Sequence, residues 1–185
     1  MKKLLLLVLP LVLLIGCKSA KMVSSETATS PNTIFQAIPA PDSPAENPYF
    51  YCSDFVENVY NSLTIDEMEN KYGSLVSKEF EPIQNIHNDH LTDTILSFSS
   101  GSNLIQFLKA RHADILLRVD ITDGRITLFE NIRPGMTKAD FQTKFSIRHE
   151  LPDVLEIGTS EQTSSFTFRF RAGKLSRISS DLYID

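Results

Sequence analysis

Two stretches of alternating apolar and polar residues place the strongest limit on what this chain can fold into. In residues 164–171 every second residue is aromatic, namely Phe166, Phe168 and Phe170. Residues 115–121 alternate in the same way, with Ile115, Leu117, Val119 and Ile121 in step. Successive side chains of a strand point to opposite faces, so each stretch predicts a strand with one buried and one solvated face. We therefore expect an antiparallel sheet with one face covered.

Other segments extend this expected sheet. Further strands are predicted at residues 94–98, 103–108, 125–129, 154–158 and 174–184, with turns at Ser100-Gly101 and Asp123-Gly124. Residues 74–93 are polar and irregular and are interpreted as a connection. In the last predicted strand Leu175 is out of step with Ile178, which predicts a β-bulge between them.

Helical spacing of apolar residues predicts three helices. The first lies within residues 47–62 and begins near Ser53 or Asp54. The second follows Thr64, which with Glu67 has the spacing of a capping box, and ends near Gly73 in an expected left-handed C-cap. The third carries Phe141 and Phe145 on one face.

The third predicted helix repeats the plan of the second. Residues 136–145 match residues 63–72 in the positions of the capping threonine, an acid, a lysine and an aromatic residue, and residues 168–175 match 119–126. Chance similarity of two amphipathic helices and two hairpins is the alternative. The match predicts an α+β fold of two tandem helix-plus-antiparallel-sheet repeats, with one sheet face packed on helices. The repeats would occupy residues 48–131 and 132–185.

The N-terminus contains two lysines, an apolar run and the motif Leu14-Ile15-Gly16-Cys17, which resembles the lipobox of bacterial lipoproteins. The resemblance implies a signal peptide at residues 1–16, a lipid anchor on Cys17 and a place in the cell envelope. Lys18 follows where inner-membrane retention would need an aspartate, so the outer membrane is expected. A plain cleaved signal with an incidental cysteine is the alternative. Residues 17–47 are rich in Pro, Ser and Thr and predict a tether.

The stretch Arg133-Pro134-Gly135-Met136-Thr137 is followed by a predicted helix and by a hairpin containing Gly173-Lys174-Leu175. This arrangement resembles the SmpA/OmlA and BamE outer-membrane lipoproteins, and two such units in tandem resemble the β-lactamase inhibitory protein. The resemblance implies tandem repeats that bind proteins. The first copy departs from it, because Ser62-Leu63-Thr64 stands where Gly-Met-Thr is expected, and the disulfides of the secreted inhibitor are absent.

Charge and cysteine content exclude several classes of function. The formal net charge is −5, and cleavage before Cys17 would remove Lys2 and Lys3, whereas nucleic-acid binding needs a clustered basic surface. If Cys17 carries lipid, Cys52 has no partner for a disulfide or a cysteine-based zinc site. Cys52 is interpreted as a small buried apolar residue, with a reactive thiol as the alternative.

No familiar catalytic motif is present, so we predict no enzyme activity, no cofactor and no metal site. The best metal candidate is His87-Asn88-Asp89-His90, which lacks a further ligand and is interpreted as a solvated loop. A metal-dependent enzyme using His87 and His90 is the corresponding alternative function.

The predicted binding residues lie on the outer face of the sheet. They are Arg118, Asp120, Arg169, Arg171, Arg177 and Tyr183. Arginine and tyrosine are enriched at interface hot spots, so this face is where we expect a partner. The sequence thus predicts a non-catalytic lipoprotein that binds or assembles envelope or outer-membrane proteins. The alternative is an inhibitor of a periplasmic or extracellular hydrolase.

Overall fold

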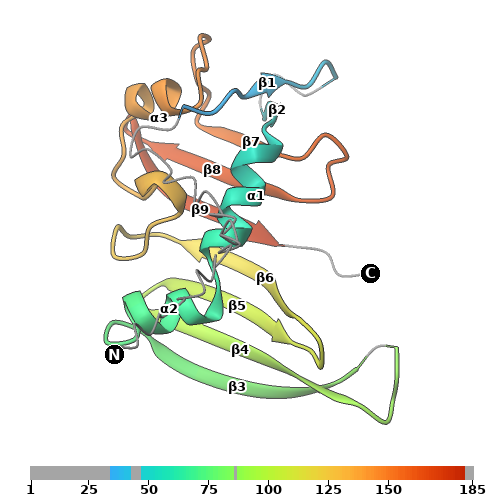
Figure 1. The fold of residues 1–185 in the computed structure, drawn as a ribbon. Coiled ribbons are helices and arrows are strands. Elements are labelled where there is room, and N and C mark those ends of the chain that lie inside the picture. The colour runs from blue at the N-terminus through green and yellow to red at the C-terminus, as the bar shows by residue number, and fades with distance from the viewer. Residues whose placement is uncertain (1–33, 43–46, 86, 182–185) are drawn as a thin grey trace, which may run out of the picture.

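A single mixed sheet forms the centre of the molecule, and helices pack on one side of it (Figure 1). The computed structural model describes residues 34–42, 47–85 and 87–181. Residues 1–16, Cys17, the tether up to residue 33 and Tyr183 therefore lie outside the described residues. The sheet has nine strands in the order β1-β2-β7-β8-β9-β6-β5-β4-β3.

The elements have the following bounds. The strands are β1 (Ile38–Pro39), β2 (Tyr49–Tyr51), β3 (Ser77–Gln84), β4 (Thr92–Ser100), β5 (Asn103–Lys109), β6 (Asp114–Ile121), β7 (Val154–Gly158), β8 (Ser165–Arg171) and β9 (Lys174–Asp181). The helices are α1 (Ser53–Ser62), α2 (Ile65–Tyr72) and α3 (Lys138–Lys144), with a 3₁₀ turn η1 (Phe129–Asn131). Strand β2 pairs parallel to β7, and the other neighbouring strands pair antiparallel.

The α+β class is confirmed, but the prediction of two tandem repeats is wrong. Strands β6 and β9 pair directly, with Asp120 opposite Ser179, so the two predicted sheets are one. The helices also share one hydrophobic core, because Phe55 of α1 contacts Phe166 and Phe141 of α3 contacts Phe168. A repeat with its own core and its own sheet does not exist in the described part of the chain.

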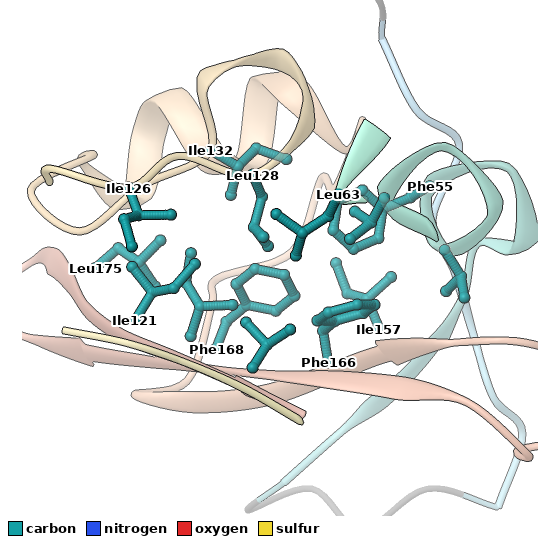
Figure 2. Close-up of a cluster of buried hydrophobic side chains, with 14 of the residues drawn as sticks. Phe55, Leu63, Ile121, Ile126, Leu128, Ile132, Ile157, Phe166, Phe168 and Leu175 are labelled. Atoms are coloured by element: carbon teal, nitrogen blue, oxygen red, sulfur yellow. The ribbon is translucent and has the colours of Figure 1, made fainter. Parts of the chain in front are cut away.

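The predicted match between residues 119–126 and residues 168–175 is wrong for a local reason. Residues 168–175 form the β8–β9 hairpin, whereas the chain leaves the sheet after Ile121. The Asn103 side chain accepts hydrogen bonds from the backbone N–H groups of Thr122 and Asp123, which ends the strand. The predicted strand at 125–129 is consequently absent. Instead this segment crosses over the sheet and buries Ile126 and Leu128 against it (Figure 2).

The largest strand that the sequence pattern did not reveal is β3, at the edge of the sheet. Its residues lie in the stretch interpreted as an irregular connection, and all but one are exposed. An edge strand with no packed face shows no apolar alternation. Glu79, Glu81 and Pro82 are residues that typically protect such an edge from pairing with another chain.

The helix caps agree with the sequence at two of three positions. The backbone N–H of Glu67 donates to Thr64 Oγ1 at 3.2 Å, and that of Asp140 donates to Thr137 Oγ1 at 3.1 Å. The predicted left-handed cap at Gly73 is wrong, since its φ is −52° and its ψ is −33°. Its lack of a side chain matters for another reason, because a Cβ there would clash with the backbone carbonyl of Glu69.

The register of the last hairpin confirms the predicted bulge. Arg169 pairs with Arg177 and Phe170 pairs with Leu175, so Ser176 is the extra residue. This shift lets both Leu175 and Ile178 face the helices, where their side chains are 2% and 0% exposed. Figure 2 shows Leu175 pointing from the sheet toward Ile126, and Phe168 pointing toward Leu128.

Candidate partner-binding face

The sheet surface opposite the three helices is the candidate site, and we call it the open face. One row of register partners runs across it from β3 to β2. The row is Ser77, Ser99, Leu104, Asp120, Ser179, Thr167, Glu156 and Tyr49. Most of its residues are small and polar, so this row of the open face is polar around its charged side chains.

Two pairs of cationic residues occupy facing positions on β8 and β9. Arg169 lies opposite Arg177, and Arg171 lies opposite Lys174. All four side chains belong to exposed residues. Like charges placed directly opposite on neighbouring strands destabilise a sheet, so this arrangement works against the fold that carries it. It concentrates positive charge in a chain whose net charge is −5.

One of these cations has an acidic partner on the same face. Arg177 donates from Nε to Asp120 Oδ1 at 2.8 Å and from Nη2 to Asp120 Oδ2 at 2.6 Å. This two-bond geometry fixes the guanidinium in the plane of the carboxylate. The pair also joins β6 to β9. Within the described residues no salt bridge reaches Arg169, Arg171 or Lys174.

The structure brings together five of the six residues predicted for this face. Arg118 and Asp120 lie on β6, and Arg177 lies on the neighbouring β9. Arg169 and Arg171 lie on β8, the next strand. The sixth, Tyr183, lies outside the described residues.

Sequence reasoning missed Lys174 as a member of the site. Lys174 belongs to the face because the hairpin turn at Ala172 and Gly173 pairs it with Arg171. Both turn residues have positive φ, 51° and 73°, as a two-residue type I′ turn requires. The pair Ala-Gly flanked by two alternating stretches was the available signal for this register.

Tyr49 closes the row at the β2 end of the open face. Its hydroxyl donates to the backbone oxygen of Thr159 at 3.0 Å, and the residue is only 9% exposed. Burial, together with the nearby carboxylate of Glu156, raises the pKa of Tyr49 from 10.0 to about 12. Tyr49 is thus a buried, hydrogen-bonded residue with a structural role at this end of the sheet.

The other residues considered from the sequence have structural explanations. In the loop between β3 and β4, Asn85 Oδ1 accepts from the backbone N–H groups of His87 and Asn88, and Asn88 Oδ1 accepts from that of His90. Such local bonds are typical of polar turns. Among the described residues no cluster of three or more potential ligands could hold a metal ion.

Cys52 is buried at the start of α1, at 5% exposure, and burial raises its thiol pKa. A protonated, inaccessible thiol is unreactive, which agrees with the interpretation of Cys52 as a small buried apolar residue. None of the helices between residues 34 and 181 that the structure describes is long and apolar enough to cross a membrane.

We compared the chain with protein-family models, with curated proteins and with solved structures, and none of these comparisons found a match.

Proposed function

We propose that this protein is a non-catalytic binding module of the bacterial cell envelope, which engages an acidic protein surface through the cations of the open face. In this proposal lipid on Cys17 holds the module at the membrane, in the outer membrane as the residue after Cys17 indicates. The partner is an envelope or outer-membrane protein.

The observation that carries the proposal is the pairing of cations across β8 and β9. A sheet gains stability from opposite charges or apolar residues at facing positions, and it loses stability from Arg169 opposite Arg177 and Arg171 opposite Lys174. Residues that work against the fold are expected where function requires them. A complementary acidic surface would relieve the repulsion and gain charge-assisted hydrogen bonds from the guanidinium groups.

The Asp120–Arg177 pair also holds one cation of the open face in a defined position. With Arg177 held by two bonds, one guanidinium on the face is preorganised, and less side-chain entropy is lost on binding. Arg169 and Arg171 project from β8, a central strand with neighbours on both sides, so their backbone positions are also fixed. A rigid cationic platform suits recognition of a folded acidic surface.

Charge reversal tests the proposal. We expect Arg169→Glu/Arg171→Glu to abolish recovery of the partner when the protein is cross-linked in intact cells and identified by mass spectrometry. Long-range steering between opposite charges should also make wild-type recovery fall as salt rises. Recovery of membrane proteins supports an assembly role, whereas recovery of a soluble hydrolase would assign the face to an inhibitor instead.

The matched control is Arg148→Glu/Arg111→Glu. Arg148 lies beyond the C-terminal end of α3 and Arg111 lies in the loop between β5 and β6, and both are exposed, so this variant makes the same change in net charge away from β8. Equal partner recovery from wild type and from Arg169→Glu/Arg171→Glu, with both proteins folded by circular dichroism, would remove the open face from the proposal.

A further inference from the structure

A pocket of about 390 Å³ lies on the helix side of the sheet, opposite the open face. Its lining comes from the end of α1, the start of α2, β5 and the start of β6. Its walls come from the helix junction at Tyr60, Leu63 and Ile65, and its floor comes from Phe107 and Leu116. This volume is at the lower end of the range for sites that enclose a small group, about 300 to 1,000 Å³.

The pocket floor belongs to an apolar row that continues to the edge of the sheet. The row consists of Leu116, Phe107, Leu96 and Phe80, which are successive register partners on β6, β5, β4 and β3. Leu116, Phe107 and Leu96 are 4%, 2% and 1% exposed, so the row reaches the surface only at the pocket and at Phe80. Phe80 at its end is 60% exposed, although it points to the same side as the core. Three strand spacings make the row about 14 Å long, which is the reach of about four extended residues.

The rim of the pocket carries negative charge. Asp66 lies in the first turn of α2, and Asp114 begins β6; both are exposed and both line the pocket. Asp114 is 3.6 Å from Lys109, while Asp66 forms no ion pair within the described part of the chain. An apolar hollow with carboxylates at its mouth complements an apolar group that bears a cation nearby.

We propose that this pocket binds an apolar side chain of a partner polypeptide, flanked by lysine or arginine, and that the same segment is long enough to reach Phe80, which lies at the other end of the row. The basic residues meet Asp66 and Asp114, and a second apolar residue covers Phe80. A polypeptide fits better than a small molecule, because a small molecule would fill the pocket and leave Phe80 uncovered. This site is on the opposite side of the sheet from the open face and is independent of the function proposed for that face.

The absence of tryptophan from this chain gives a direct binding assay, because indole fluorescence then reports the ligand alone. The probe is the peptide acetyl-Leu-Ser-Lys-Trp-Lys-Ser-Leu-amide, titrated with the full-length protein. We expect saturable binding with a blue shift of the indole emission. The peptide with both lysines replaced by glutamate should bind at least about tenfold more weakly, since opposite charges at the rim become like charges.

Three variants locate the peptide on the surface. Asp66→Asn/Asp114→Asn should weaken binding of the lysine peptide by roughly tenfold, whereas the matched control Glu79→Gln/Glu81→Gln on the other face of β3 should leave it unchanged. Phe80→Ser should weaken binding of the lysine peptide by about three- to tenfold, which is the effect of losing one aromatic contact. Tryptamine, which presents the same indole with one ammonium group, should bind far more weakly than the peptide and be insensitive to Phe80→Ser.

Several results would overturn the proposal. Equal binding of the lysine and glutamate peptides would show that charge complementarity does not contribute. Unchanged affinity of Asp66→Asn/Asp114→Asn for the lysine peptide would show that the peptide does not bind at the pocket. Tryptamine binding as tight as the peptide would assign the pocket to a small organic amine instead. None of these results bears on Arg169 and Arg171, so a failure here is distinguishable from a failure of the open face.

Discussion

If the cations of the open face serve a partner, removing them should make the isolated protein more stable. Arg171 and Lys174 face each other with no salt bridge to either among the described residues, so Arg171→Thr removes a repulsion. Arg169→Thr removes a weaker one, because the charge of Arg177 opposite is already offset by Asp120. Threonine is also a good strand residue, so the backbone of β8 is not weakened.

The magnitude follows from the geometry of facing positions. Two unit charges about 6 Å apart in water repel by roughly 0.7 kcal/mol, and measured facing pairs contribute about 0.2 to 1 kcal/mol. We therefore expect Arg171→Thr to raise the free energy of unfolding by about 0.5 kcal/mol and Arg169→Thr by about 0.2 kcal/mol. The double variant should gain about 0.7 kcal/mol, which corresponds to a urea midpoint higher by roughly 0.4 M.

Urea denaturation followed by circular dichroism measures this change, because urea adds no ionic strength. At about 20 mM salt the double variant should unfold at the higher midpoint, and at about 0.5 M salt the difference should vanish as the repulsion is screened. Arg148→Thr serves as the control for each single variant, since it also removes one positive charge, from an exposed position outside the sheet.

A lower midpoint for the double variant would refute the reasoning. It would mean that the aliphatic parts of Arg169 and Arg171 stabilise the sheet by covering it, as long cationic side chains can. A gain that persists unchanged at high salt would also refute it, because the gain would then come from strand propensity and not from charge.

Two further predictions follow from the backbone and from Tyr49. Ala172 holds φ at 51° in the hairpin turn, a conformation that asparagine tolerates better than alanine, so Ala172→Asn should raise the free energy of unfolding by about 0.5 to 1 kcal/mol in the same urea assay. Because the folded pKa of Tyr49 is raised from 10.0 to about 12, its neutral form stabilises the fold below pH 10 and this contribution is lost as the pH rises from 10 to 12. Tyr49→Phe should lower stability at pH 7, through loss of the bond to Thr159, and should lose less than wild type does between pH 10 and 12; an equal alkaline loss would contradict the assignment.

The sequence was sufficient to predict elements whose apolar pattern is determined by a single buried face. Alternation located β8 and most of β9, and helical spacing located α1, because in each case one face meets the core. For β6 it located the strand, but the register shift opposite Gln106 and Phe107 buries Leu116 in place of the predicted Leu117. It could not locate β3, which has no packed face. It also misread residues 125–129, where Ile126 and Leu128 are buried by a crossing segment and alternate as they would in a strand.

Predicting which strands pair is a separate problem from predicting where each strand lies in the sequence. The apolar pattern tells which face of a strand is buried, but pairing of β6 with β9 and of β2 with β7 joins residues far apart in the chain. The prediction of two sheets failed at this step. The predicted grouping of Arg118, Asp120, Arg169 and Arg177 depended only on which face each residue occupies.

The start of the fold also bears on how the open face is presented. The tether was predicted to extend to residue 47, yet the backbone N–H of Phe35 donates to the oxygen of Lys144 at 2.8 Å. The Phe35 ring is 3% exposed and stacks on Phe145 with centroids 5.3 Å apart, while Ile34 and Ile38 remain exposed. The chain thus joins the folded body at Phe35, well before β2. If Cys17 is lipidated as proposed, the segment before Phe35 connects the membrane to the folded domain. The contact of Phe35 with Lys144 and Phe145 is then the point from which the domain, with the arginines of the open face, is held.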